Sequence, residues 1–303
     1  MSNLGLIDRP IDRPVVTTGA ESRAERRLEL RASLRHAAGK LDLILSVAVV
    51  VVFIVLSFFP TIATSLNPIL ADPRASFQAP SAAHWFGTDE LGRDLWSRVV
   101  HGASLSLSAA CYAVLLSFVI GTVLGVVAGT TGGWIDALIM RIFDAVLAIP
   151  GLLMVFAILA VLGNGVMNIA LAIGIAGSVS FGRVMRSEVM SVRSSTYVEA
   201  ASALGVRPFG VVTRHIIPNA ITPLISLAAL EFGTAMLTIG AMGYLGFGAE
   251  PPLAEWGALI ADGQKFIRTS WWLGVLPGIV FVIVVLAVNR IARVVGQGGN
   301  TNA

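Results

Sequence analysis

The residue types that carry most enzyme chemistry form no recognisable catalytic pattern in this 303-residue chain. Its four histidines form no His-Glu-x-x-His metal site, and no Gly-x-Ser-x-Gly nucleophile turn occurs. A loop that cradles nucleotide phosphates needs Gly-Lys before Ser or Thr, but the two lysines, Lys40 and Lys265, precede Leu41 and Phe266. The single cysteine, Cys111, excludes a disulfide within the chain. We therefore predict no catalytic, metal or cofactor site, and any nucleotide must bind to another protein.

The composition is that of a membrane protein. Hydrophobic residues make up 55% of the chain and charged residues 13%, and the mean hydropathy is +0.82. A helix needs about 20 apolar residues to cross the hydrocarbon core. The stretch from Asp144 to Arg183 is long enough for two helices with a turn at 163–165, and the other apolar stretches are 43–59, 105–128, 219–245 and 271–289. We predict an all-α polytopic membrane protein with six transmembrane helices.

The basic residues predict the orientation, because cytoplasmic flanks hold an excess of Lys and Arg. With the N-terminus inside, 16 of the 21 basic residues are cytoplasmic, so both termini are predicted to be cytoplasmic. The chain then has an N-terminal tail (1–40, with a helical stretch near 20–35), a transmembrane domain (41–289) and a short tail (290–303). A signal peptide is the alternative reading of the N-terminal region, but the first apolar stretch exceeds the usual 7 to 15 residues.

A loop at about residues 195–218, between the fourth and fifth predicted helices, carries the most information. We predict two short helices there. Alanines at 200, 201 and 203 favour helix and leave a low surface, over which another backbone can pass closely. Gly205 suits a left-handed helix end, and Pro208 suits the first turn of the next helix. A cytoplasmic helix with such a face is shaped to be gripped by a partner.

A second informative segment, at about residues 84–100, follows the first predicted membrane helix. On a helix, this segment would carry an apolar stripe beside two i,i+4 ion pairs. The residues are Leu91, Leu95 and Val99 for the stripe, and Asp89–Arg93 and Asp94–Arg98 for the pairs. We predict an amphipathic helix at the outer membrane surface, with a plain lead-in to the second span as the alternative.

These two segments carry a family resemblance. Glu199-Ala200-Ala201, followed by Gly205 and then Pro218, resembles the EAA loop of binding-protein-dependent ABC-transporter permeases, which docks into a cleft of the ATPase. His215-x-x-Pro-Asn is similar to the dipeptide and oligopeptide branch, although the general pattern has an aliphatic residue at that position. The Gly-Thr-Asp-x-x-Gly-Arg-Asp string at 87–94 is similar to the external helix of C-type peptide permeases. The resemblance covers about 41–289, whereas the basic tail after it departs from the family's acidic one.

The resemblance implies the type I permease fold of ABC importers, in the bacterial inner membrane. The chain would be a pore-forming subunit of an ATP-driven importer, expected to carry di- or oligopeptides. Its partners would be a second homologous permease in a heterodimer, two ATPases that bind ATP and Mg, an extracytoplasmic solute-binding protein and lipid, with no nucleic acid. The residues implied to couple to the ATPase are Glu199, Ala200, Ala201, Ala203, Leu204, Gly205 and Arg207.

The fifth predicted helix carries Glu231 near its midpoint. A charge at that depth costs about 2.5 to 3.5 kcal/mol on insertion scales, so the side chain is expected to face the protein. Thr234 and Thr238 share that side of the helix, and the three residues are candidates for the translocation pathway. A structural hydrogen bond from Glu231 to a neighbouring helix or to the partner permease is the open alternative.

Two prolines and one ion pair are assigned structural roles. Pro150 is expected to kink the third helix, because its nitrogen carries no hydrogen for the helix ladder. Pro218 closes the cytoplasmic loop. Arg141 and Asp144 lie three residues apart and are expected to pair with each other.

Other functional classes fit less well. A secondary transporter or channel should show a chain of intramembrane ionisable residues and inverted repeats, and an intramembrane enzyme should place Ser, His or paired acids at facing depths. Neither pattern occurs. The solute stays open among dipeptides, oligopeptides, glutathione, a nickel chelate and haem, because the binding protein largely selects it.

Overall fold

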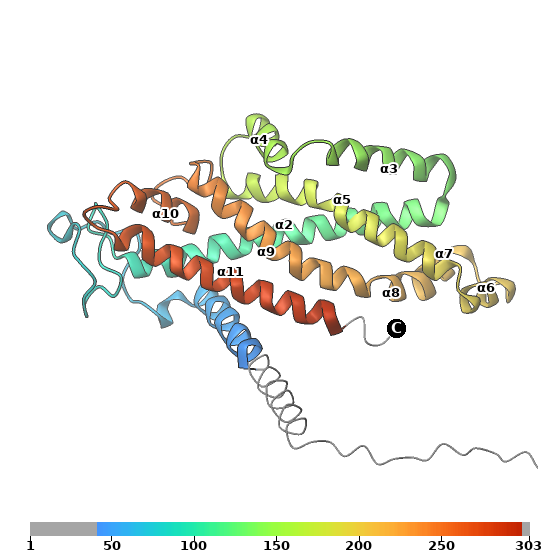
Figure 1. Ribbon diagram of the computed structural model, residues 1–303, viewed down its shortest axis with the longest axis horizontal. Coiled ribbons are helices and arrows are strands. Elements are labelled where there is room, and N and C mark those ends of the chain that lie inside the picture. Colours follow the sequence, from blue (N-terminus) through green and yellow to red (C-terminus); the bar gives the residue numbers. More distant parts are fainter. Residues whose placement is uncertain (1–40, 299–303) are drawn as a thin grey trace, which may run out of the picture. The chain divides into compact units, whose positions relative to one another are not determined.

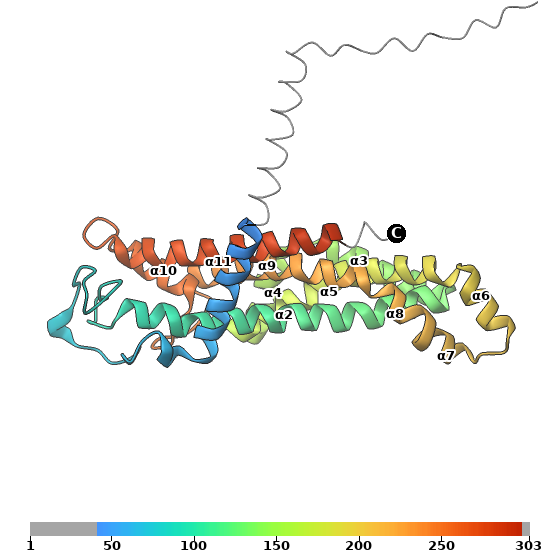
Figure 2. The ribbon, with the colours of Figure 1, turned by 90° about the horizontal axis from the view of Figure 1, so that it is seen from below.

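The computed structural model of the protein describes residues 41–298. The predicted tail at 1–40, with its helical stretch, and residues 299–303 lie outside the described residues. The chain divides into two compact units, residues 1–44 and 45–303, and the second is the helical body described below (Figures 1 and 2). Across 41–298 the only β-type pairing is one isolated bridge between Thr88 and Asp94.

Five helices among the described residues are long and apolar enough to cross a membrane. They are Leu41–Phe58, α2 (Leu95–Thr131), α5 (Val166–Arg193), α9 (Thr222–Tyr244) and α11 (Trp272–Gly298). A sixth span arises if α3 (Gly133–Leu147) and α4 (Gly151–Leu162) are taken as one, although they are bent by 93° at a break. The predicted all-α membrane fold is confirmed, and the number of spans reaches the predicted six if this bent pair is counted as one.

The break in that span lies at Pro150, as predicted, but it is far sharper than a kink. Because Pro150 has no N–H to donate and keeps its predecessor out of the helical region, α3 ends at Leu147, and Pro150 becomes the N-cap of α4. The turn predicted at 163–165 is also present. Gly163 and Gly165 have φ of 84° and 133°, and Asn168 Nδ2 closes the turn by donating to the Gly163 carbonyl at 3.1 Å.

The pair α2 and α5 makes the most extensive helix contact of the body, and the two lie side by side in Figure 1. Three glycines one turn apart on α2, at 121, 125 and 129, face α5. A Cβ on Gly125 would lie 2.6 Å from the Gly182 carbonyl oxygen, so no larger residue fits without moving a backbone. Between membrane helices such small residues permit close backbone approach and the dispersion contacts that hold the helices together.

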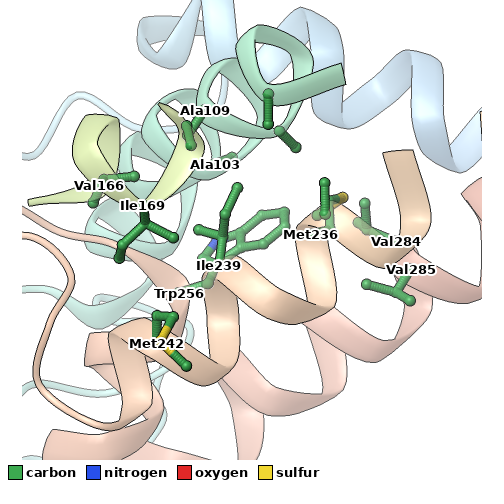
Figure 3. Close-up of a cluster of buried hydrophobic side chains, with 14 of the residues drawn as sticks. Ala103, Ala109, Val166, Ile169, Met236, Ile239, Met242, Trp256, Val284 and Val285 are labelled. Carbon is green, nitrogen blue, oxygen red and sulfur yellow. The ribbon is translucent and has the colours of Figure 1, made fainter. Parts of the chain in front are cut away.

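The core at the far end of α9 is built around Trp256, the first residue of the short helix α10 (Trp256–Gln264). Figure 3 shows the indole among side chains of α2, α9 and α11. Trp256 is fully buried, its Nε1 donates to the Val99 carbonyl at 2.9 Å, and Phe53 and Phe281 pack on it edge to face. The helix α10 therefore packs across one end of the helix bundle.

Glu255 is the N-cap of α10 and fixes this helix in place. Its carboxylate oxygens accept the backbone N–H groups of Gly257 (2.8 Å) and Ala258 (3.0 Å). The side chain is fully buried against Gly243, where a Cβ would collide with Oε2. Burial raises the pKa of this carboxyl, and the hydrogen bonds from Gly257, Ala258 and Ser106 act in the opposite direction. One carboxylate thereby joins α10, α9 and α2.

The segment before α2 corrects a prediction. An amphipathic helix over 84–100 is wrong for residues 84–94, which form an irregular loop; only the part from Leu95 onward is helical. Gly87 and Gly92 have φ of 77° and 74°, and the loop lies back on residues 72–78, where the Gln78 carbonyl receives the Thr88 N–H. A continuous helix cannot make these contacts. The short 3₁₀ turns Pro60–Ile62 (η1) and Pro73–Ala75 (η2) complete the loop.

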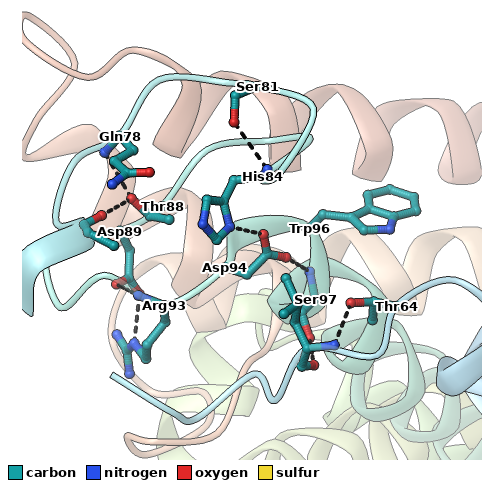
Figure 4. A network of polar contacts seen from close by, with 12 residues as sticks. Thr64, Gln78, Ser81, His84, Thr88, Asp89, Arg93, Asp94, Trp96 and Ser97 are labelled. Carbon is teal, nitrogen blue, oxygen red and sulfur yellow. Dashed lines mark hydrogen bonds and ion pairs between the residues drawn. The ribbon is translucent and has the colours of Figure 1, made fainter. Parts of the chain in front are cut away.

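Buried polar contacts fix this loop (Figure 4). Asp94 caps α2 by accepting the Ser97 N–H at 2.7 Å and contacts His84 Nδ1 at 2.9 Å. The predicted Asp89–Arg93 pair is present at 2.7 Å. The predicted partner of Asp94, Arg98, instead lies 3.7 Å from Asp89, because the capping role turns the Asp94 carboxylate away.

The last helix is longer than predicted. α11 runs to Gly298 instead of ending near Asn289, because the apolar and basic residues after Asn289 contain no helix breaker before Gly296. Most of the predicted tail at 290–303 is therefore helical.

The α2–α5 packing gives the first testable prediction. Gly125→Val should lower the stability of the purified protein by about 1–3 kcal/mol or more, because the new methyls meet the α5 backbone. Gly278→Val in α11 is the matched control, since nothing lies within 4 Å of a Cβ there. Thermal unfolding in detergent measures both variants. Equal melting temperatures would show that the glycine contact is not required.

Candidate functional site

Between α5 and α9 the chain leaves the bundle and forms the α6–α8 lobe, at one end of the body in Figure 1. The lobe consists of α6 (Thr196–Ala203), α7 (Pro208–Val211), a π-helical turn η3 (Val212–Ile216) and α8 (Ile217–Ala220). The predicted pair of short helices is confirmed. Gly205 has φ of 83° just after α6, and Pro208 occupies the first turn of α7.

A buried apolar cluster seats the lobe on the bundle. The lobe contributes four side chains and the long helices contribute four more: Val198, Val211, Ile216 and Ala220, with Phe181, Met185 and Val189 of α5 and Leu224 of α9. Because interiors pack at near-crystalline density, a displacement of the lobe must be shared with the base of α5.

The outward face of the lobe carries the residues singled out from the sequence. Glu199, Ala200, Ala203, Leu204, Gly205 and Arg207 are exposed, and Ala201 is half-buried. Leu204 is 86% exposed and Phe209 80%, and within the described residues Glu199 has no ion-pair partner. Sequence reasoning missed Phe209. Its signal was a large apolar residue directly after a helix-starting proline.

Pro218 lies in the first turn of α8, immediately after the π-helical turn. A proline cannot donate to the ladder, and a wider turn ahead of it accommodates the missing bond. Asn219 Nδ2 donates to the His215 carbonyl at 2.7 Å across the same junction. This shift of register sets the direction in which the chain enters α9.

The second candidate region is one side of α9. Glu231 is half-buried and hydrogen-bonds the Ser180 side chain of α5. One turn on, Thr234 is exposed, and two turns on, Thr238 is half-buried. Their hydroxyls donate back to the carbonyls of Leu230 (3.3 Å) and Thr234 (3.0 Å). The structure thus brings the three predicted residues along one side of α9. The hydrogen bond to Ser180 agrees with the alternative that the sequence left open, a structural bond from Glu231 to a neighbouring helix. The role in the translocation pathway stays a prediction.

Ion pairs between α3 and α5 correct another prediction. Asp144 pairs with Arg183 at 2.5 Å and not with Arg141, because α3 turns this carboxylate toward α5. Arg186 makes two bonds to Asp136, at 2.5 and 2.7 Å. These contacts flank Phe143, whose ring lies on Gly182. The bent span is thereby fastened to the same helix that carries the lobe.

Within residues 41–298, no three His, Cys, Asp or Glu side chains gather as metal ligands. The geometry offers an exposed lobe with apolar side chains, joined by a packed cluster to long membrane helices.

The sequence matches the family model of the binding-protein-dependent transport system inner membrane component over residues 121–298. Among curated proteins, it is 42% identical to the dipeptide transport system permease protein DppC of Alkalihalophilus pseudofirmus, over 82% of each chain. It is 39% identical to the probable D,D-dipeptide transport system permease protein DdpC of Escherichia coli, over 80% of this chain and 82% of that one. A glutathione transport system permease protein GsiD of Pectobacterium atrosepticum is 35% identical over 70% of each chain.

Solved structures share the fold. An amino acid ABC transporter crystallised with histidines matches with a TM-score of 0.53 at 16% identity, over 66% of this chain and 94% of that one. The inward-facing MetNI methionine ABC transporter matches with a TM-score of 0.51 at 20% identity, over 66% and 97%. The several apolar spans and the family match make this a multi-pass protein of the bacterial inner membrane. Since the family model covers more than half of the chain and its relatives exceed 30% identity over most of it, the chain belongs to the family of binding-protein-dependent transport system inner membrane components.

Proposed function

We propose that the chain is one of two pore-forming permeases of an ATP-driven importer for di- or oligopeptides. The α6–α8 lobe carries this proposal, because it presents Leu204, Phe209 and Glu199 outside the membrane helices while its other face is packed on α5. Exposed apolar side chains at the end of a loop indicate a protein contact. The relatives are named for dipeptide, D,D-dipeptide and glutathione transport.

Coupling follows from how the lobe is attached. Separate ATPase subunits bind ATP and Mg and grip the lobe through Glu199, Ala200, Ala201, Ala203, Leu204, Gly205 and Arg207. A push on α6 passes through the buried cluster to α5, and from α5 to α2 through the glycine contacts. A homologous second permease completes the pore. The lobe and both termini are cytoplasmic, and an extracytoplasmic binding protein delivers the solute at the opposite end of the body.

The solute class rests on the relatives and on the family. A peptide solute agrees with the names of the dipeptide and glutathione permeases, because glutathione is itself a tripeptide. A nickel chelate or haem is the alternative solute. Purifying the assembled complex with its binding protein and identifying the bound solute by mass spectrometry tests this assignment. Recovery of a chelate or haem instead of a peptide would contradict it.

Docking gives a testable prediction. Leu204→Asp and Phe209→Asp should each reduce the ATPase that co-purifies with the tagged permease by about tenfold or more, since a charge would enter an apolar interface. Leu70→Asp is the matched control, because Leu70 is 72% exposed on the loop at the other end. Undiminished co-purification with both lobe variants would show that the ATPase docks elsewhere.

Gly205 gives a further prediction, in which backbone strain and not steric overlap lowers transport. Nothing lies within 4 Å of a Cβ there, but φ of 83° costs a β-branched residue about 1–3 kcal/mol. Gly205→Val should therefore permit insertion and assembly while peptide uptake falls relative to ATP hydrolysis. Gly210→Val in α7, where φ is not positive, is the control. If Gly205→Val transports as well as that control, the left-handed break has no part in coupling.

Glu231 gives another prediction. A pathway residue should be reached by water, so Glu231→Cys in a Cys111→Ala background should react with a membrane-impermeant thiol reagent at a rate that depends on the ATP state. Thr234→Cys, exposed one turn away, should follow the same pattern. Glu231→Gln keeps the hydrogen bond to Ser180 and should retain most transport if the role is structural. Labelling that is absent in every state, or that is indifferent to ATP, would remove Glu231 from the pathway.

A further inference from the structure

A continuous groove runs between the helix Leu41–Phe58 and α2. It consists of two cavities of about 420 and 360 Å³, which share three serines at their junction: Ser57, Ser104 and Ser108. The transport mechanism proposed above uses no residue of this groove. The inference below rests on the membrane fold and is independent of the transported solute.

The cavity nearer the loop 59–94 is the polar end of the groove. Besides the serines it is lined by His101 and by the prolines of the neighbouring loops. His101 Nδ1 lies 2.8 Å from the Ser97 carbonyl, so in the neutral ring Nδ1 carries the proton and Nε2 is an acceptor. Among the described residues, neither Nε2 of His101 nor Oγ of Ser104 has a hydrogen-bond partner. The polar end therefore offers one acceptor and one hydroxyl donor to a ligand.

The larger cavity is mostly apolar and extends along α2, away from the loop 59–94. Its walls come from four helices and are mostly aromatic and branched aliphatic side chains, among them Phe53, Leu107, Leu115, Phe232 and Val284. From Ser104 to Leu115 the groove follows α2 for about 16 Å at 1.5 Å per residue. That length is about half of the 30 Å hydrocarbon core, or one leaflet.

The dimensions select the occupant. The groove is about one leaflet long, its walls are mostly apolar, and its unpartnered polar groups lie at one end. A single hydrocarbon chain whose headgroup lies at the polar end matches this distribution. The chain supplies the dispersion contacts that an empty groove beside the bilayer would lack.

We propose that this groove binds one aminophospholipid from the leaflet on the side of loop 59–94. One acyl chain lies along α2 past Cys111, the phosphate accepts the Ser104 hydroxyl, and the headgroup ammonium donates to His101 Nε2. The lipid joins the helix Leu41–Phe58 to the body, because the groove walls come from that helix and from α2, α9 and α11.

Native mass spectrometry of the intact complex tests this site in an equal mixture of phosphatidylethanolamine, phosphatidylcholine and phosphatidylglycerol. At collision energies that strip other lipids, the wild type should retain one phosphatidylethanolamine for this subunit. Cys111→Phe fills the groove and should lose it. Val119→Phe, two turns further along α2 and 56% exposed outside the groove, should retain it. Ser104→Ala should reduce the preference for phosphatidylethanolamine over phosphatidylcholine.

A second measurement needs no variant. Phosphatidylethanolamine with a photoactivatable group in mid-chain, added to the wild-type complex, should cross-link to residues 104–115 in preference to 119–127. Equal retention by Cys111→Phe, retention of all three lipids alike or of detergent only, or cross-links spread evenly along α2 would each overturn the proposal.

Discussion

Close approach of α2 to α5 is the contact on which the rest of this structure depends. Lipid tails are as apolar as leucine, so membrane helices gain little from burying apolar surface against each other and rely on dispersion between closely packed backbones. Glycines at 121, 125 and 129 permit that approach. The same helix α5 receives Phe143 of the bent span on Gly182 and its carboxylates on Arg183 and Arg186. Any residue larger than glycine at these positions would separate the elements that α5 joins.

From this pair the structure extends in two directions. At one end, Val198, Val211 and Ile216 bury the inner face of the α6–α8 lobe on the base of α5, which leaves Leu204 and Phe209 exposed. At the other end, Trp256 and Glu255 fix α10 against α2 and α9, and buried carboxylates fix the loop before α2. We infer that a displacement of the lobe moves the whole body, because one buried apolar cluster packs the inner face of the lobe on α5.

Local chemistry in the sequence was enough for much of this account. Apolar length predicts the spans, Pro150 the break, and Gly205 with Pro208 the two short helices, since each depends on residues that are neighbours in the chain. The loop at 84–94 was misread, because helical periodicity cannot reveal a backbone that folds back on residues 72–78. The Arg183 partner of Asp144 was missed for the same reason, as 39 positions separate the two. Phe209 was missed because its exposure depends on which face of the lobe is buried against α5.

A displacement of the lobe is transmitted through a stiff helical body. One distance tests this most directly. Spin labels at Leu91→Cys and Ser202→Cys, in a Cys111→Ala background, lie on exposed residues at the two ends of the body. Pulsed electron paramagnetic resonance on the transport-competent complex, containing one doubly labelled permease, measures their separation without nucleotide and with ATP trapped. The account predicts the same mean distance in both states. A distance that changes with the ATP state would contradict it, because the lobe would then move without the helices above it.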